Sequence, residues 1–237
     1  MQTLIKLSLI YIFGGTIGWI SEFFFRRAVH KKWINPGFLV GPNLPLYGTG
    51  IMLLYIICSF DYSFISSAVW RTVFIILVIT VAMTAIEYIT GLIFIKGMNV
   101  KLWDYSDRFG NIQGIICPLF TLAWGAAGTA YYFLVHSHLV AAADWIAANP
   151  IYSYFLGIYF GIMLIDVCYS FRVVDRIRKW AKEKNIVVRY EELKETIKTR
   201  AAALKQKHSF VLPFKTNRGL NKELDDYNSA TTETEKK

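Results

Sequence analysis

The sequence predicts an all-α, multi-pass membrane protein with five transmembrane helices. Composition is the first reason: 54% of the 237 residues are hydrophobic and 16% aromatic, while only 18% are charged. Together with a mean hydropathy of +0.37, these values exceed those of soluble domains. Five long apolar stretches and an alternating distribution of basic residues are the second and third reasons. The predicted location is the cell (plasma) membrane.

Each predicted span is close to the length that a membrane requires. Roughly 30 Å of hydrocarbon is crossed by about 20 helical residues, which rise about 1.5 Å each. The first stretch has no small-residue cleavage site before Arg26, so it is predicted to be a permanent span rather than a signal peptide. The five predicted spans, of which the second is the shortest, are residues 4–25, 46–64, 73–95, 112–135 and 151–171.

The basic residues predict the orientation of the chain. The connection between the second and third spans has only Arg71 at its end, and the connection between the fourth and fifth has no Lys or Arg. Because connections rich in Lys and Arg stay in the cytosol, the N-terminus is predicted outside and the C-terminus inside. The basic residues cluster after the first and third spans, at Arg26, Arg27, Lys31, Lys32, Lys96, Lys101 and Arg108.

The chain after the last span is strongly basic. Residues 172–237 hold 17 Lys and Arg against 10 Asp and Glu, which is +7 of the total formal charge of +9. Such a segment beside the inner leaflet attracts anionic lipid, so membrane lipids are predicted partners and nucleic acid is not. Anchoring of the topology by positive charge is favoured over a specific partner site.

These features divide the chain into three predicted regions. Residues 1–171 form the five-span membrane domain, and residues 172–212 form a basic helical segment in the cytosol or at the interface. Residues 213–237 are rich in Asn, Ser, Thr, Glu and Lys, a composition that predicts disorder. Apolar residues follow helical spacing in the middle region, at Val174, Ile177, Trp180 and Ala181.

Common catalytic and metal-binding patterns are missing from the sequence. There is no GxxxxGK[ST] loop, so the chain is not expected to hydrolyse ATP itself, and there is no GxSxG or HExxH element. His136 and His138, with Asp144 beyond them, could bind a metal, but a solvated outer loop is the preferred interpretation. No metal or cofactor is predicted. The cysteines are isolated on separate spans and favour core positions: Cys58, Cys117 and Cys168.

An ordered set of residues occurs twice along the chain. The order is Glu, Trp, Asn, Pro, Gly in both copies, and both copies begin and end outside. This pattern predicts a parallel repeat of two-helix units, although chance in a sequence rich in Gly and aromatics is the alternative. The first copy is Glu22, Trp33, Asn35, Pro45 and Gly48, and the second is Glu87, Trp103, Asn111, Pro118 and Gly125.

Three acidic residues lie inside apolar stretches and are the main candidates for a functional site. A carboxylate in hydrocarbon is costly, so Glu22, Glu87 and Asp166 each need a partner, a proton or water. All three fall in the inner halves of their spans and are predicted to line one inward-facing polar cavity. The segments 34–50 and 109–118, rich in Gly, Pro and Asn, are predicted to be partly re-entrant beside it.

Two of the three carboxylates also have purely structural explanations. Glu22 precedes Arg26 by four residues, the favourable order for an ion pair within a helix. Glu87 is harder to explain in this way, because no basic residue lies between Arg71 and Lys96, and it is the strongest candidate. Asp166 could bond to polar neighbours near the interface, namely Tyr169, Ser170 or Arg172.

Polar and aromatic residues complete the predicted cavity. Trp103 and Tyr105 could also be part of an aromatic belt at the interface, whereas Asp104 at the cavity mouth is less easily explained as structural. The full candidate set is Glu22, Glu87, Asp166, Asn35, Trp103, Asp104, Tyr105, Asn111 and Arg26.

Six stretches together form a distinctive pattern: Gly18-Trp-Ile-Ser-Glu22, Trp33-Ile-Asn-Pro-Gly-Phe-Leu39, Gly41-Pro42, Pro45-Leu-Tyr-Gly-Thr-Gly50, Leu102-Trp-Asp-Tyr-Ser106 and 111–125. This pattern resembles a known bacterial membrane family, labelled "Putative ABC-transporter type IV" or CmpB-like. The resemblance covers roughly residues 10–135, with Pro36 at a position where the family pattern has Arg. It implies a permease-like membrane subunit and an ATPase or other transporter subunit as partner.

Hypotheses from different functional classes follow. In the first, the chain is a transporter or permease-like subunit in which Glu22 and Glu87 bind a cation, a proton or a cationic substrate group. In the second, it is an integral-membrane enzyme acting on a lipid or envelope precursor. Glu87 or Asp104 would then be the general base, and Arg26 or Arg27 would hold a phosphate. A membrane scaffold with a regulatory tail is the third.

Overall fold

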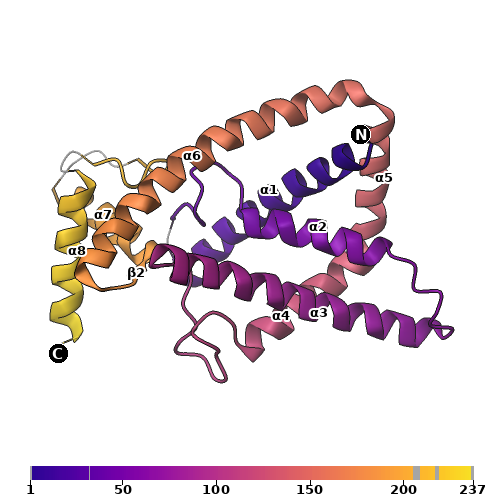
Figure 1. Ribbon diagram of the computed structural model, residues 1–237, viewed down its shortest axis with the longest axis horizontal. Helices are drawn as coiled ribbons and strands as arrows, with labels where there is room; N and C mark the ends of the chain where they lie inside the picture. The colour runs from indigo at the N-terminus through magenta and orange to yellow at the C-terminus, as the bar shows by residue number, and fades with distance from the viewer. Residues whose placement is uncertain (1, 32, 205–208, 217–218, 236–237) are drawn as a thin grey trace. The chain divides into compact units, whose positions relative to one another are not determined.

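The chain is mostly helical, as the sequence predicts (Figure 1). The computed structural model describes residues 2–31, 33–204, 209–216 and 219–235. The α-helices are α1 (Gln2–His30), α2 (Pro45–Ser59), α3 (Ala68–Leu92), α4 (Pro118–Ala130), α5 (His136–Ala148), α6 (Ser153–Lys184), α7 (Tyr190–Ala203) and α8 (Leu220–Glu235). The π-helical turns η1 (Ile93–Gly97) and η2 (Tyr131–Val135), the 3-10 turn η3 (Pro150–Tyr152) and the two-residue strands β1 (Val100–Lys101) and β2 (Val188–Arg189) complete the order.

Three helices of the described chain are long and apolar enough to cross a membrane: Gln2–Val29, Ala68–Gly97 and Pro150–Lys184. They correspond to the first, third and fifth predicted spans. The second predicted span differs, because α2 has 15 residues and reaches only about 22 Å of the roughly 30 Å required. The fourth begins six residues later than predicted, at Pro118, after a turn closed by a bridge between Ile112 and Ile116. The five-span topology stays a prediction.

Two segments predicted to lack structure are helical. Residues 136–148, interpreted as a solvated outer loop, form α5, whose buried residues Leu139, Ala143 and Ala147 recur every four positions. Residues 220–235, within the segment predicted to be disordered, form α8. Although this helix is mostly polar, it has a short apolar stripe, in which Leu220 and Leu224 are buried one turn apart.

The predicted interfacial helix is not separate from the last span. Helix α6 continues without a break to Lys184, and the chain then passes through β2 into α7. The helical spacing predicted for this region is confirmed, because the residues that it places on one face are buried: Val174, Ile177, Trp180 and Ala181.

The chain forms two compact units, each assembled from three separate stretches. Unit 1 comprises residues 1–20, 42–90 and 105–164, and unit 2 comprises residues 21–41, 91–104 and 165–237. The linear boundaries predicted at residues 171 and 212 stay a prediction. The long helices α1, α3 and α6 each contribute to both units.

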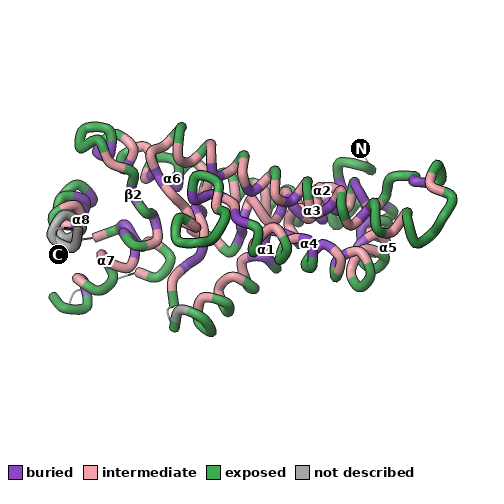
Figure 2. The backbone as a smooth tube through the Cα atoms, turned by 90° about the horizontal axis from the view of Figure 1, so that it is seen from below, coloured by how far each residue is buried: buried purple, intermediate pink, exposed green. Residues whose placement is uncertain are grey.

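Close glycine contacts hold the helices of unit 1 together. A Cβ atom on Gly48 would lie 2.8 Å from the Tyr11 carbonyl oxygen, so α2 packs tightly on α1. A Cβ atom on Gly125 would lie 2.7 Å from Thr80 Oγ1, so α4 packs equally tightly on α3. Small residues that allow such approach are typical of helix packing in membranes. The buried core, purple in Figure 2, includes Ile10, Leu54, Ile79, Met83, Tyr131 and Leu139.

Polar contacts and a short parallel strand pair organise unit 2. Strand β1 pairs with β2 in parallel, with Val100 opposite Val188. Helix α8, yellow in Figure 1, lies beside α6 and α7 and is bound by its acidic residues. Trp180 Nε1 donates to Asp225 at 2.8 Å, and Arg200 binds Glu223 at 2.9 Å and Asp226 at 2.8 Å.

Candidate functional site

Glu87 lies in the apolar helix α3 and is only 3% exposed. Both of its carboxylate oxygens accept hydrogen bonds from neutral donors. The Tyr105 hydroxyl donates to Oε1 at 3.1 Å, and Trp124 Nε1 donates to Oε2 at 2.9 Å. Within the part of the chain that the structure describes, Glu87 forms no ion pair. Glu87 lies on α3, Tyr105 in the connection before α4 and Trp124 on α4, all within unit 1, and they form what we call the Glu87 triad.

The two donors of the Glu87 triad are held in place independently of the carboxylate. The Tyr105 ring stacks on Phe120, with centroids 4.2 Å apart and planes 10° apart, and its backbone N–H donates to the Gly114 carbonyl at 2.8 Å. The Trp124 ring meets Tyr47 edge-on at 5.5 Å. Because packing fixes the two rings, their polar atoms point toward the Glu87 carboxylate without depending on the hydrogen bonds to it.

Hydroxyl groups continue from Glu87 along the seam between α3 and α4. Thr80 and Thr84 lie seven and three residues before Glu87, so all three share one face of α3. Thr84 Oγ1 lies 3.3 Å from Thr121 Oγ1 on α4. The Thr80 hydroxyl donates to the Ile76 carbonyl and the Thr84 hydroxyl to the Thr80 carbonyl. The seam is therefore polar along two turns of an otherwise apolar helix.

Asp166 holds the backbone of the segment that follows α1. It accepts hydrogen bonds from the Val40 N–H at 2.9 Å and the Gly41 N–H at 2.7 Å, and from the Ser170 hydroxyl at 3.0 Å. A Cβ atom on Gly41 would lie 3.0 Å from Asp166 Oδ2, which is why the backbone approaches so closely there. The bond to Ser170 was one of the expected structural explanations.

Glu22 forms the expected ion pair with Arg26, at 2.8 Å and one helical turn away. Arg26 also binds Glu191 of α7 through its other terminal nitrogen. One guanidinium group is thus shared by two carboxylates, and its side chain is only 16% exposed.

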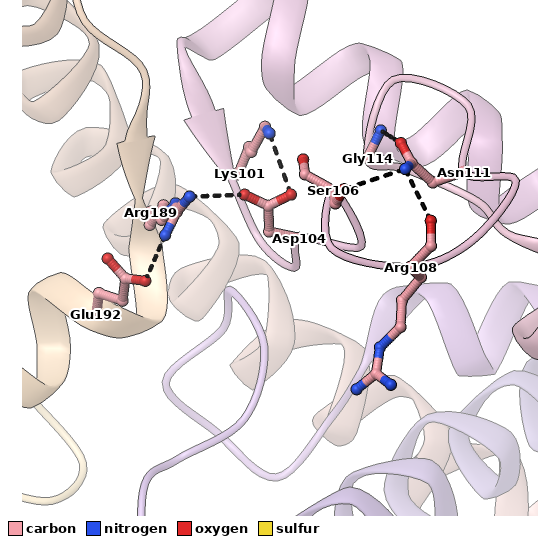
Figure 3. Close-up of polar contacts among 8 residues, drawn as sticks. All are labelled: Lys101, Asp104, Ser106, Arg108, Asn111, Gly114, Arg189 and Glu192. Carbon is pink, nitrogen blue, oxygen red and sulfur yellow. Dashed lines mark hydrogen bonds and ion pairs between the residues drawn. The ribbon is translucent and has the colours of Figure 1, made fainter. Parts of the chain in front are cut away.

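The two asparagines of the predicted repeat each organise a loop. Asn35 is 3% exposed and donates from Nδ2 to the carbonyls of Leu39 and Val40. Asn111 donates from Nδ2 to the carbonyls of Ser106 and Arg108, and its Oδ1 accepts from the Gly114 N–H (Figure 3). Each asparagine thus binds backbone groups of its own loop, but Asn35 donates to residues after it and Asn111 to residues before it, and the repeat stays a prediction.

Asp104 takes part in a chain of charges across the strand pair. Its carboxylate binds Lys101 at 3.2 Å and Arg189 at 3.3 Å, and Arg189 also binds Glu192 at 3.0 Å (Figure 3). The hydrogen bond that Arg189 donates to Glu192 and the charge of Glu192, with a smaller effect of Asp104, raise the pKa of Arg189. Trp103 beside it is partly buried.

The predicted site residues fall into two groups with separate partners. Glu87, Tyr105 and Asn111 belong to unit 1, whereas the others belong to unit 2. Their union in one inward-facing cavity stays a prediction. Among the described residues, no group of three or more His, Cys, Asp and Glu could hold a metal ion. The members of unit 2 are Glu22, Arg26, Asn35, Trp103, Asp104 and Asp166.

Some contact residues escaped the sequence reasoning. Trp124 stands beside Gly125 in the second copy of the repeat, and this position could have marked it as a candidate. Glu191 and Arg189 gave no such signal, because charged residues are expected throughout a basic segment that is predicted to be cytosolic. Lys194 was not singled out from the sequence either, and it is a buried residue of α7 with only 3% exposure.

Comparison with known protein families identifies the family of this chain. A family model described as "Putative ABC-transporter type IV" matches residues 9–171, which extends the resemblance seen over residues 10–135 through the last apolar span. No curated protein and no solved structure matches the chain. The matched segment contains all the predicted site residues, from Glu22 to Asp166. The chain therefore belongs to the family described as "Putative ABC-transporter type IV".

Proposed function

We propose that this chain is the membrane subunit of a transport system in which Glu87 binds a proton or a cationic group of the substrate. The observation that carries the proposal is the environment of the Glu87 carboxylate. It lies on a helix apolar enough to cross a membrane, both oxygens are held by neutral donors, and it has no described ion-pair partner. Acidic groups retained inside spans are typically those that bind an ion, a proton or substrate.

The threonine seam supports transport rather than a closed structural contact. Thr80, Thr84 and Thr121 provide hydroxyl groups between α3 and α4, leading away from Glu87 along the helix. A polar path of this kind gives a cation or proton successive oxygen ligands across an apolar layer. We therefore place the path of the transported group along this seam.

The family description supports a permease-like role. Since the sequence has no P-loop, ATP hydrolysis in such a system would come from a separate ATPase subunit. The proposed parallel repeat is supported by matching details: Pro45 and Pro118 each begin a helix, and Gly48 and Gly125 each make the close contact that joins a helix pair.

The enzyme alternative finds less support in the geometry. It requires Arg26 or Arg27 to bind a substrate phosphate. Arg26 is occupied by Glu22 and Glu191, whereas Arg27 donates to the Lys31 carbonyl and has no described carboxylate partner. It requires Asp104 or Glu87 as general base, but Asp104 is bound by two basic side chains and Glu87 by two donors. No described observation favours catalysis over transport.

The test compares cells that lack the chain with cells that carry the wild type, Glu87→Gln or Asp144→Asn at matched membrane abundance. Asp144 is the control, because it is an acidic residue of the same unit whose side chain is 54% exposed. Untargeted metabolite and lipid profiles are measured in each strain. Glu87→Gln should reproduce the profile of cells lacking the chain, whereas Asp144→Asn should resemble the wild type.

The nature of the changed compounds separates the two functional classes. A changed distribution of a small solute between cells and medium supports transport. Accumulation of a lipid or envelope precursor inside the cells would support the enzyme alternative instead. A wild-type profile in the Glu87→Gln strain would remove the case for an ionisable functional group at this position.

A further inference from the structure

We propose that unit 2 contains a binding site for one anionic phospholipid, in a pocket between the segment after α1 and helix α7. This site is independent of the Glu87 triad and of the proposed transport function. The pocket has a volume of about 280 Å³. It is lined by Trp33, Ile34, Asn35, Lys194, Lys198, Ala202, Phe210 and Pro213, which we call the Lys194 pocket.

The cations of the Lys194 pocket differ from other cations of unit 2 in their partners. Arg26, Arg189 and Arg200 each bind two carboxylates. Lys194 instead donates to the carbonyls of Asn35, at 3.0 Å, and Gly37, at 2.6 Å. Among the described residues it forms no ion pair, although it is 3% exposed. The charge of Glu191 acts on Lys194 without forming an ion pair, so an anion in the pocket would give this buried ammonium group a direct charge partner.

Lys198 adds a second ammonium group to the same pocket. It lies one turn after Lys194 on α7 and donates to the Trp33 carbonyl at 3.0 Å. Its side chain is exposed, so it has N–H groups available to a ligand while one is bound to the backbone. Arg27 lies 5.3 Å from the centre of the Trp33 ring and adds positive charge nearby. Two ammonium groups one turn apart fit a phosphate better than a single carboxylate.

The remaining walls of the pocket are apolar and continue toward a membrane helix. Trp33 and Phe210 are each 40% exposed. Both pack on Phe23 of α1, with ring centroids 4.6 and 5.7 Å away. Phe23 lies within Gln2–Val29, which is apolar enough to cross a membrane. A ligand with a phosphate at one end and a hydrocarbon chain at the other matches these two kinds of wall.

The size of the pocket limits what part of the ligand it can enclose. A volume of about 280 Å³ is at the lower end of the range for small-molecule sites, roughly 300–1,000 Å³. It is sufficient for a phosphoglycerol headgroup and the start of an acyl chain. The rest of the lipid would remain in the bilayer, which distinguishes this site from one for a soluble anion.

The full chain is purified in detergent, freed of lipid and titrated with phosphatidylglycerol. Phosphatidylcholine with the same acyl chains and glycerol 3-phosphate are parallel probes, and native mass spectrometry counts the bound molecules. We expect one saturable phosphatidylglycerol molecule, bound about tenfold more tightly than phosphatidylcholine, because charge-assisted contacts to a net anion are the stronger ones. Glycerol 3-phosphate should bind weakly, since it lacks the apolar part.

Three variants separate a built site from general attraction to a basic segment. Lys198→Gln removes a pocket charge, and Ala202→Phe fills the pocket without changing charge. Lys182→Gln removes an exposed charge of α6 that does not line the pocket. The first two should each weaken binding about tenfold, and the third should leave it unchanged.

Three results would overturn the proposal. Equal weakening by Lys182→Gln and Lys198→Gln, with Ala202→Phe unaffected, would mean diffuse electrostatic attraction. Glycerol 3-phosphate binding as tightly as phosphatidylglycerol would mean a site for a soluble anion. Absence of a bound phosphatidylglycerol molecule in the folded wild type would mean no site. Size-exclusion profiles of each variant confirm that folding is intact before binding is compared.

Discussion

Replacing Glu87 by alanine or by glutamine should have very different effects on stability. Alanine leaves the Trp124 N–H and the Tyr105 hydroxyl, both on partly buried residues, without their acceptor. Each unsatisfied buried group costs about 1–3 kcal/mol, so Glu87→Ala should lose about 2–6 kcal/mol of unfolding free energy. Glutamine can keep both bonds, because its oxygen accepts from Trp124 and its amide donates to the Tyr105 oxygen. Glu87→Gln should therefore lose less than about 1 kcal/mol.

The measurement is equilibrium unfolding of the full chain in detergent, followed by tryptophan fluorescence. Tyr105→Phe, made alone and together with Glu87→Gln, completes a double-mutant cycle. A coupling well below about 1 kcal/mol is expected, because glutamine still pairs with the tyrosine hydroxyl, so loss of that hydroxyl costs about the same in both backgrounds. Equal destabilisation by Glu87→Gln and Glu87→Ala would refute the two-donor arrangement.

Further predictions concern packing, the C-terminal helix, pH and topology. Gly128→Ala should destabilise the chain by about 1–3 kcal/mol, because its Cβ atom would lie 2.2 Å from Ile79 Cγ2. Gly157→Ala, which has open space around it, should not destabilise the chain, and thermal melts of the two variants test both expectations. Leu224→Ala, at a fully buried position of α8, should cost about 2–5 kcal/mol, and unchanged protease resistance of residues 190–235 would contradict it. Burial lowers the pKa of Lys194 from 10.5 to about 8, so the unfolded chain binds more protons between these values. Unfolding free energy should rise by about 3 kcal/mol from pH 8 to pH 10.5 in the wild type, relative to Lys194→Met. Reporters fused after Lys101 and Lys184 should be cytosolic and one within α5 external, and a cytosolic signal from α5 would overturn the five-span topology.

The sequence predicted best those helices whose formation depends least on contacts with distant parts of the chain. Composition and apolar length sufficed for α1, α3 and α6, because membrane insertion depends on local hydrophobicity. The same criteria overestimated the second span, since apolar residues after Ser59 belong to a loop rather than to α2. Helix α8 was missed because its stability comes from a few buried apolar residues and from Arg200, a partner outside the helix.

Only the part of the candidate site that depends on local sequence could be predicted. The cost of a carboxylate in an apolar helix identified Glu87 without any knowledge of its neighbours. Its donors could not be chosen from the sequence, because Tyr105 and Trp124 reach it from segments 18 and 37 residues away. The burial of Lys194 could not be predicted at all, because nothing in the sequence distinguishes it from the exposed lysines of the same basic segment.

The composition of unit 2 from three stretches has a consequence for the synthesis of the protein. Strand β1 finds its partner only when β2 has been made, 88 residues later in the chain. Unit 1, in contrast, contains no residue beyond 164. Because the chain is synthesised from its N-terminus, unit 1 can assemble during translation, whereas unit 2 cannot be completed until its last stretch has been made. Premature termination before residue 188 would therefore leave the parts of α1, α3 and α6 that belong to unit 2 without the elements that complete this unit.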